Sequence, residues 1–492
     1  MNTTKRELTC SQTLAQFAEG LRFDDIPPQV VSKVKTHVLD SIGVGLAGST
    51  MEWSRKAGGI FQLLGGAPDA TVLGRNWRTS MPNAAIANGI SIAAMDYDDT
   101  DYKGGGCHMS RCVVSCGLAV GEALQRSGKD VIKAIVLGYE TATRIGSALL
   151  LDRYGPRAAR SSWGEAELEA HHKMQRQGGA LIRGYIPGLF ASALTAGSLM
   201  RLSSAQLVAA QGLVGGLGLF LGQSHREGTD ALLVHAGWAS QAGIIATLWA
   251  REDLKGPTQV YEGDRGLLSV IGGDLQDSTR ITSGLGTEWN SLNNVLKFYP
   301  GGHGTHHFIE SLKFLIDEHH LKMANIAHID CHAPSQRIEF HFEPREAKLR
   351  PTSYNARFSL PYLLSRLTAD GELGPLSFTA EKVSEPRVLD MAARVGYTAD
   401  EAAWFGDKRG LVTVTLKNGQ SLTRSTPELL GFPARPCTLD DVTKKFTANA
   451  KLVIDDPEQL KALLGALKDL QDVQDINTVM RLTSPKQEPG AA

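Results

Sequence analysis

A run of carboxylates between two apolar stretches is the first place in this chain where chemistry is expected. Residues 96–108 read Asp-Tyr-Asp-Asp-Thr-Asp-Tyr-Lys-Gly-Gly-Gly-Cys-His, so four carboxylates fall within six positions. Like charges at this spacing repel one another, which raises the pKa of a carboxyl group or calls for a cation. The glycines allow backbone to approach a ligand, and a helix expected to begin near Ser110 presents N–H groups that favour an anion. The same composition is typical of a solvated acidic turn, so the spacing leaves both interpretations open.

A second cluster combines a lysine with three histidines. Residues 297–307 read Lys-Phe-Tyr-Pro-Gly-Gly-His-Gly-Thr-His-His. A lysine supplies carboxylate recognition and a histidine supplies proton transfer, so the segment predicts a small-molecule site. Two alternatives stay open. His303, His306 and His307 could ligate a metal with Glu310 one helical turn after His306, or they could form a surface cluster without a role.

Other catalytic patterns are missing from the sequence. It contains no Gly-x-Ser-x-Gly elbow, no P-loop and no Rossmann glycine fingerprint after a predicted strand. The acidic run does not match an EF-hand, and Cys107, Cys112 and Cys116 do not have the spacing of an iron–sulfur site. The sequence therefore gives no support to hydrolase, nucleotide or dinucleotide functions, and we expect no cofactor.

The overall composition narrows the class of protein. The 492 residues carry 51 Lys+Arg and 52 Asp+Glu, a net charge of -1 that argues against a nucleic-acid partner. The N-terminal residues lack the apolar stretch of a secretory signal, and the most apolar runs, 188–200 and 207–221, are shorter than the ~18 residues of a membrane span. Six cysteines do not suggest a disulfide framework. We expect a cytoplasmic protein that binds neither membranes nor nucleic acid.

Hydrophobic periodicity indicates the elements that must position the two clusters. From residue 11 to about 271 the pattern is helical, with a helix expected to begin at Pro27 and Pro28. Glycines inside these segments suggest closely packed helices. After residue 296 the pattern changes: alternation over 337–342 predicts a strand, and Asn418-Gly419 predicts a hairpin turn.

The fold class follows from these elements. A final helix from residue 456 carries an apolar stripe, so we expect it to dock on the helical part. We predict a mainly α protein with a large all-helical body (residues 1–293), an inserted smaller α+β lid domain (294–432) and C-terminal helices (433–492) that complete the body.

Short motifs in a fixed order carry a family resemblance. They are LDSIGVGLAG at 39–48, ANG at 87–89, MDYDDT at 95–100, GYE at 138–140 with RI at 144–145, HAG at 235–237, GP at 256–257, KFYP at 297–300, FSLPY at 358–362 and the segment 439–446. With these motifs the chain resembles the MmgE/PrpD superfamily, which includes 2-methylcitrate dehydratase and cis-aconitate decarboxylase. The resemblance implies a helical body with an inserted α+β lid, a homodimer, and metal-independent chemistry on small di- and tricarboxylic acids.

The resemblance also implies roles for single residues. His108 is similar to the catalytic histidine of the family's acidic loop, and Asp96 would orient it or raise its pKa. Lys297 and Thr100 would bind carboxylates. Tyr362 would close the site from the lid as a donor or proton relay.

Three positions depart from the family pattern. Gly302 stands where a histidine is expected, and His303 is the nearest substitute. Leu232 stands where the family usually has a lysine, which implies a substrate lacking one carboxylate or a different partner for it. The third lies before the helix expected at 189–199, where the family often has a histidine. Here the segment 181–185 follows a long charged insertion at 153–177. Arg183 or a histidine of the insertion could compensate, or the insertion could remodel the pocket.

These observations predict a metal-independent lyase, a dehydratase or decarboxylase, for a small di- or tricarboxylic acid of the 2-methylcitrate or cis-aconitate type. The reaction would use acid–base chemistry next to a carboxylate. The candidate catalytic residues are His108, Asp96, Lys297 and Tyr362, and the candidate substrate-binding residues are Thr100, His303 and Arg183. Two alternatives remain: an epimerase or isomerase of a small dicarboxylate, and a divergent family member that has lost catalysis.

Overall fold

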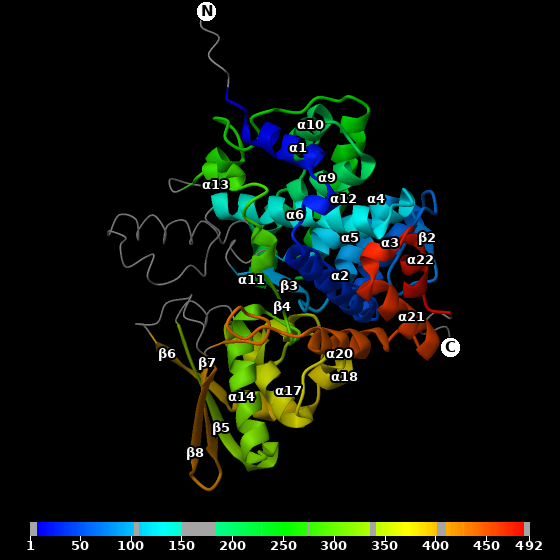
Figure 1. The fold of residues 1–492 in the computed structure, drawn as a ribbon. Coiled ribbons are helices and arrows are strands. Elements are labelled where there is room, and N and C mark those ends of the chain that lie inside the picture. Colours follow the sequence, from blue (N-terminus) through cyan, green and yellow to red (C-terminus); the bar gives the residue numbers. More distant parts are fainter. Residues whose placement is uncertain are drawn as a thin grey trace, which may run out of the picture.

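The structure is a computed structural model of the whole chain, and Figure 1 shows its fold. It describes residues 7–102, 108–149, 183–227, 229–272, 276–334, 341–400, 410–426 and 428–486. The insertion predicted at 153–177 and the glycines at 104–106 lie outside the described residues, as does most of the strand predicted at 337–342.

Helices make up most of the described chain, which confirms the mainly α prediction. In the first part they are α1 (Cys10–Gly20), α2 (Pro28–Ser49), α3 (Glu52–Leu64), α4 (Met81–Ala93), α5 (Ser110–Ala123), α6 (Gly128–Ala148), α9 (Ile186–Met200), α10 (Ser204–Val214), α11 (Gln223–Glu227), α12 (Ala231–Arg251) and α13 (Thr279–Thr282). Later in the chain they are α14 (His306–His319), α16 (Arg345–Leu349), α17 (Leu360–Asp370), α18 (Ala380–Val383), α19 (Pro386–Ala393), α20 (Leu439–Ala450), α21 (Pro457–Lys468) and α22 (Asn477–Met480).

One hydrophobic core joins the N-terminal helices to the C-terminal ones. Helices α4, α5, α6, α9 and α12 pack against one another, and α2 packs against α4, α20 and α21. The same core contains residues from Leu14 to Leu296 and from Val442 to Met480. We call this group of helices the helical body.

A second core lies within residues 294–432, which we call the α+β unit. Its sheet has the order β6-β5-β7-β8, formed by β6 (Val395–Asp400), β5 (Ile326–Pro334), β7 (Gly410–Leu416) and β8 (Ser421–Thr426). Strand β6 is parallel to β5, whereas the β5–β7 and β7–β8 pairs are antiparallel. Helices α14 and α17 pack against each other beside this sheet (Figure 1).

Two short strands connect the helical body to the α+β unit. Strand β3 (Asp99–Asp101) lies within the acidic run, and β4 (Asn294–Leu296) immediately precedes Lys297. They pair antiparallel, with Thr100 opposite Val295. The acidic segment, predicted as a loop, is therefore partly a strand, and this pairing brings the two predicted clusters together. A third pair, β1 (Ala70–Thr71) with β2 (Arg78–Thr79), lies apart from them.

The structure confirms one local prediction and corrects another. Strands β7 and β8 form the predicted hairpin, and Gly419 has a φ of 87° that a turn glycine adopts easily. The prediction of a single final helix from residue 456 was wrong, because α21 ends at Lys468 and the short α22 begins at Asn477. The side chain of Asp475 accepts hydrogen bonds from the backbone and side chain of Asn477, which offers the backbone an alternative to a continuous helix. The predicted stripe is nevertheless buried at Leu463, Leu467, Leu470, Ile476 and Val479.

One helix in the described chain is long and apolar enough to cross a membrane. It is α12, and 61% of its most apolar window is buried inside the structure. Since α12 packs against α4, α9 and α10, its apolar composition is accounted for by its place in the core of the helical body.

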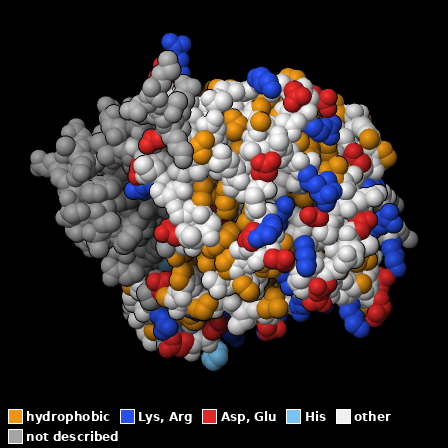
Figure 2. All heavy atoms as spheres, turned by 45° about the horizontal axis from the view of Figure 1, so that its top comes forward, with side chains coloured by type: hydrophobic (Ala, Val, Ile, Leu, Met, Phe, Trp, Pro, Cys, Tyr) orange, Lys and Arg blue, Asp and Glu red, His pale blue; other side chains and the backbone are white. Residues whose placement is uncertain are grey.

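On the face shown in Figure 2, lysines and arginines lie among aspartates and glutamates rather than in a basic stripe.

The glycine at the crossing of α2 and α4 gives a stability prediction. A Cβ at Gly48 would lie 1.9 Å from the carbonyl oxygen of Ser91, so Gly48→Ala forces two helix backbones apart. Overpacking of this kind costs about 1–3 kcal/mol in the free energy of unfolding. Gly59→Ala in α3 is the control, because its Cβ would meet no atom within 4 Å. It should stabilise by up to about 1 kcal/mol. Urea unfolding measures the change in the free energy of unfolding for each variant. Equal changes in Gly48→Ala and Gly59→Ala would contradict the close packing of α2 against α4.

Candidate active site

The acidic segment turns sharply after α4 because Asp96 adopts a left-handed conformation. Its φ is 50°, and its N–H donates to Ala93 O at 3.0 Å. The side chains of Trp53 and Arg357 both donate to Ala94 O, so the turn is held from the helical body and from the α+β unit. Residues 98–101 are buried, so the interpretation as a solvated turn does not hold.

A buried ion pair joins the two predicted clusters. Lys297 Nζ lies 2.9 Å from Asp96 Oδ1 and donates to the Asp96 carbonyl oxygen at 3.0 Å. The Lys297 N–H donates to Asp98 O at 3.0 Å, which continues the β3–β4 pairing. Burial raises the pKa of Asp96, but the nearby charges of Lys297, His108 and Arg111 outweigh it and hold this pKa well below its usual range.

Arg111 completes the cluster, and sequence reasoning missed it. Its Nε donates to Asp98 Oδ2 at 2.7 Å, while Nη2 donates to Asp96 Oδ1 at 2.9 Å and to Asp98 Oδ1. Its Nη1 donates to the Tyr185 hydroxyl at 3.1 Å. The two carboxylates thus meet two cations, Lys297 and Arg111. The available signal was a lone arginine near the start of an otherwise small and apolar helix, α5.

His108 lies at the edge of this cluster, with one ring nitrogen within 4.8 Å of carboxylate oxygens of Asp96 and Asp98. Its Nδ1 lies 2.6 Å from Asp99 O. A carbonyl oxygen only accepts, so Nδ1 carries the proton and Nε2 of the neutral ring is left with a lone pair. The orienting group is therefore the Asp99 backbone rather than the Asp96 carboxylate.

The pKa of His108 is lowered to about 4, so the upward effect expected from Asp96 does not decide the net shift. Burial lowers the pKa first, and the positive charges of Lys297 and Arg111 lower it further. Asp96 and Asp98 act in the expected direction, but they are outweighed. His108 is therefore neutral at neutral pH in the unliganded protein.

Asp99 anchors the strand from behind. Its carboxylate accepts from the Tyr139 hydroxyl at 2.8 Å and from the Ser110 N–H at 3.1 Å, and it lies 3.3 Å from His37 Nδ1. Burial raises the pKa of Asp99, but His37 and these hydrogen bonds hold it well below the ordinary value. His37 is buried in α2.

The remaining predicted residues lie in different places. Thr100 is buried in β3, next to the cluster. Tyr362 belongs to the core of the α+β unit, where its hydroxyl donates to Ser377 O, so the structure does not bring it to the cluster. Arg183 begins a short 3-10 turn two residues before Tyr185, but its side chain lies outside the described part of the chain.

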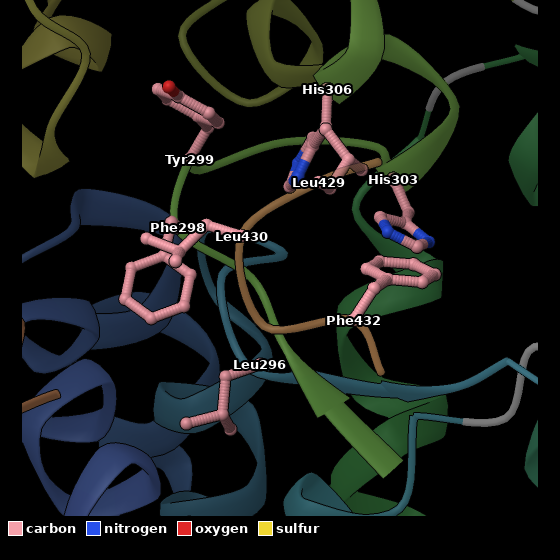
Figure 3. A pocket seen from close by; sticks show the side chains of 8 residues that line it. All are labelled: Leu296, Phe298, Tyr299, His303, His306, Leu429, Leu430 and Phe432. Carbon is pink, nitrogen blue, oxygen red and sulfur yellow. The ribbon is translucent and has the colours of Figure 1, made fainter. Parts of the chain in front are cut away.

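His303 and His306 line a small pocket (Figure 3). Its other walls are Leu296, Phe298, Tyr299, Leu429, Leu430 and Phe432. The His303 ring stacks on Phe432 with centroids 5.3 Å apart.

The histidines of this segment do not converge as a metal site would require. His306 Nε2 faces Gly301 O at 3.3 Å, and His307 Nδ1 faces Thr426 O at 3.0 Å. Glu310 accepts from Arg435 at 2.7 Å. Burial lowers the pKa of His306 to about 3, with Lys297 contributing. Within the described residues, the group with metal-binding potential is instead Asp96, Asp98 and His108, whose carboxylates already face Lys297 and Arg111.

A second tyrosine that the sequence did not single out lies near the cluster. Tyr354 belongs by sequence to the α+β unit but packs in the core of the helical body, edge-on to Trp53 at 5.8 Å. The residue is 4% exposed, and the Arg357 guanidinium carbon lies 3.6 Å from its ring centre. Among the described residues its hydroxyl makes no hydrogen bond of regular geometry. Burial raises the pKa of Tyr354, and Asp96 contributes to the rise. An unpartnered buried hydroxyl beside charged groups is expected to donate to a ligand.

The depressed pKa of His108 makes stability depend on pH. Between its unfolded value of 6.5 and about 4, the unfolded chain binds a proton that the folded protein does not. Stability at this residue is therefore complete above pH 6.5 and falls by about 3 kcal/mol as the pH drops to 4. His108→Asn should lose this dependence.

Urea unfolding between pH 7 and 4 tests the prediction through the difference between the two proteins. The two proteins must be compared because Asp40, with its pKa raised to about 6, is present in both. It makes stability increase as the pH falls, which is opposite to the effect of His108. The exposed His319, at the end of α14, provides the control His319→Asn, which should keep the wild-type dependence. Identical dependence in wild type and His108→Asn would show that the His108 pKa is not depressed.

The chain is similar to known proteins over nearly its whole length. The MmgE/PrpD N-terminal domain matches residues 12–279, and the MmgE/PrpD C-terminal domain matches residues 299–469. Human cis-aconitate decarboxylase is 24% identical over 96% of this chain and 95% of its own length. The cis-aconitate decarboxylase-like protein of Aspergillus oryzae is 25% identical over 96% of both chains, and the cis-aconitate decarboxylase of Aspergillus terreus is 24% identical over 95% of this chain and 94% of its own length. The chain belongs to the MmgE/PrpD family.

Proposed function

We propose that the protein is a lyase that removes carbon dioxide or water from a small di- or tricarboxylic acid at a carbon next to a carboxylate. The observation that carries this proposal is the neutral His108, whose Nε2 is left free to take a proton beside two buried cations, Lys297 and Arg111. The family and the full-length similarity to cis-aconitate decarboxylases support lyase chemistry of this kind.

Lys297 and Arg111 would bind the carboxylates of the substrate. Lys297 donates a hydrogen bond to the Asp96 carbonyl oxygen and pairs with the Asp96 carboxylate, and its ammonium would also donate to a substrate carboxylate. Arg111 uses four of its five N–H groups on Asp96, Asp98 and Tyr185. The Tyr185 hydroxyl accepts from Arg111 and so keeps its own proton for donation. These donors, with Tyr354, suit an anion with more than one oxygen-bearing group.

The substrate charge would itself prepare His108 for acid catalysis. The pKa of His108 is depressed partly by positive neighbours, so an arriving polycarboxylate raises it again. In decarboxylation the carbon–carbon bond breaks, its electron pair is delocalised into the neighbouring carboxylate system, and protonated His108 returns a proton to carbon. In dehydration neutral His108 takes the α-proton, the carbon–oxygen bond breaks as the double bond forms, and protonated His108 gives the proton to the departing hydroxyl, which leaves as water. Both routes use the same side chain at the same place.

We also propose that the reaction needs no metal. The carboxylates of Asp96 and Asp98 already contact Lys297 and Arg111, and a divalent cation would have to displace them or face their charge. Incubation with EDTA should therefore leave turnover unchanged.

The test is a substrate panel followed by mass spectrometry of the products. The panel contains cis-aconitate, trans-aconitate, citrate, 2-methylcitrate and several dicarboxylates, each with and without EDTA. Loss of 44 or 18 mass units is expected (~44 for carbon dioxide, ~18 for water), and His108→Gln should reduce that rate by about 10²–10⁴-fold. Unchanged turnover in His108→Gln, or activity abolished by EDTA and restored by a metal, would overturn the proposal. A product of unchanged mass would instead identify an epimerase or isomerase.

Two tyrosines of the α+β unit form a matched pair for a second prediction. Tyr354→Phe removes the unpartnered hydroxyl near Asp96, and we expect kcat to fall about 10–100-fold, as for loss of one donor at a reacting group. Tyr362→Phe removes a hydroxyl that bonds Ser377, so it should cost about 1 kcal/mol of stability and leave kcat unchanged. Kinetics and thermal unfolding of both variants show which tyrosine acts in the reaction. A larger loss of kcat in Tyr362→Phe than in Tyr354→Phe would support Tyr362, the residue assigned from the sequence.

A further inference from the structure

A buried lysine behind the proposed site takes no part in the chemistry described so far. Lys445 lies on α20, far from the other site residues in sequence, and is 7% exposed. Its ammonium donates to Tyr97 O at 2.8 Å and to Lys297 O at 2.7 Å, and it lies 2.7 Å from Asp40 Oδ1. The ammonium therefore has two backbone acceptors and one carboxylate counter-ion.

Two of the three oxygens belong to the backbone that carries the Asp96–Lys297 pair. Tyr97 follows Asp96 directly, and the second carbonyl is that of Lys297 itself. The ammonium also lies 4.0 Å from the centre of the Tyr97 ring. One side chain from the C-terminal part of the chain thus holds both backbone segments, in addition to the contact between their side chains.

Asp40 makes this arrangement electrostatically possible. Lys445 and Lys297 are like charges, and the positive charge of Lys297 adds to burial in lowering the pKa of Lys445. The buried carboxylate of Asp40, on α2, opposes this effect and keeps the ammonium charged. Removing either member alone would leave an unpaired buried charge, whereas removing both would not.

We propose that Lys445 is a positioning residue for the active site. By fixing the carbonyls of Tyr97 and Lys297, it sets the distance between the Lys297 ammonium, Asp96 and His108. Asp40 serves as its counter-ion. The kinetic part of this inference rests on the proposed function, whereas the placement of Lys297 beside His108 does not.

The experiment separates positioning from folding with two charge-balanced double variants. Lys445→Met/Asp40→Asn removes the buried pair and the two donors to backbone. Lys444→Met/Asp440→Asn makes the same chemical change in the adjacent exposed pair on α20, whose members lie 2.7 Å apart. The single variant Lys445→Met, with its unpaired Asp40, gives the effect of losing charge balance.

The first readout is the titration of His108 by NMR of histidine-labelled protein, with His108→Asn used to assign the signal. Lys297 lowers the pKa of His108, so loss of its position should raise that pKa measurably from about 4. The second readout is kinetic: kcat should fall about 10–100-fold with KM changed less than about threefold, because the lost effect is the orientation of reacting groups. Thermal stability of the buried double variant should exceed that of Lys445→Met.

The outcomes are distinguishable. A buried double variant that is folded, titrates His108 near 4 and turns over like Lys444→Met/Asp440→Asn would overturn the proposal and leave Lys445 a stability residue. A raised His108 pKa in a protein for which no substrate turns over would support the positioning role while the proposed function fails. A buried double variant no more stable than Lys445→Met, with unaltered His108 titration in its folded fraction, would also count against positioning.

Discussion

The ion pair between Asp96 and Lys297 is the interaction on which the rest of the site depends. Placing charges in buried surroundings costs several kcal/mol each unless they are paired and hydrogen-bonded. Asp96 and Asp98 meet Lys297 and Arg111, so the four charges balance before any substrate arrives. His108 is neutral at pH 7 because its pKa is lowered to about 4. Negative charge added beside the cluster would raise this pKa, so His108 is the group that an approaching anion would lead to take up a proton.

The site with this balanced set of charges is formed by three parts of the chain that lie far apart in the sequence. Strand β3 comes from the helical body, β4 begins the α+β unit, and Lys445 arrives from the C-terminal helices. None of these contacts is local in sequence, so none forms until the parts of the chain between them have folded. The site is therefore a property of the whole chain rather than of either core alone.

The sequence predicted the helical character and the two segments that carry the chemistry, because periodicity, turn glycines and clustered charges are local signals. It placed Asp96, His108, Thr100 and Lys297 correctly in one neighbourhood only through the family resemblance. Arg111, Tyr185 and Tyr354 escaped because their roles arise from packing between helices far apart in sequence, for which the local residues carry no mark. The sign of the His108 pKa shift escaped for the same reason: Asp96 is close in sequence, whereas burial and the cations that outweigh it are set by the fold.

The position of Tyr354 has a consequence for how substrate could enter and leave. This ring is attached to one core and buried in the other, against Trp53. Burying an aromatic side chain stabilises by about 1.5–3 kcal/mol, so any motion that parts the two cores must first withdraw it. Tyr354 would therefore help to hold the two cores together, in addition to its proposed role as a hydrogen-bond donor. If product release limits turnover, the free-energy cost of withdrawing Tyr354, rather than bond cleavage at His108, would determine the rate.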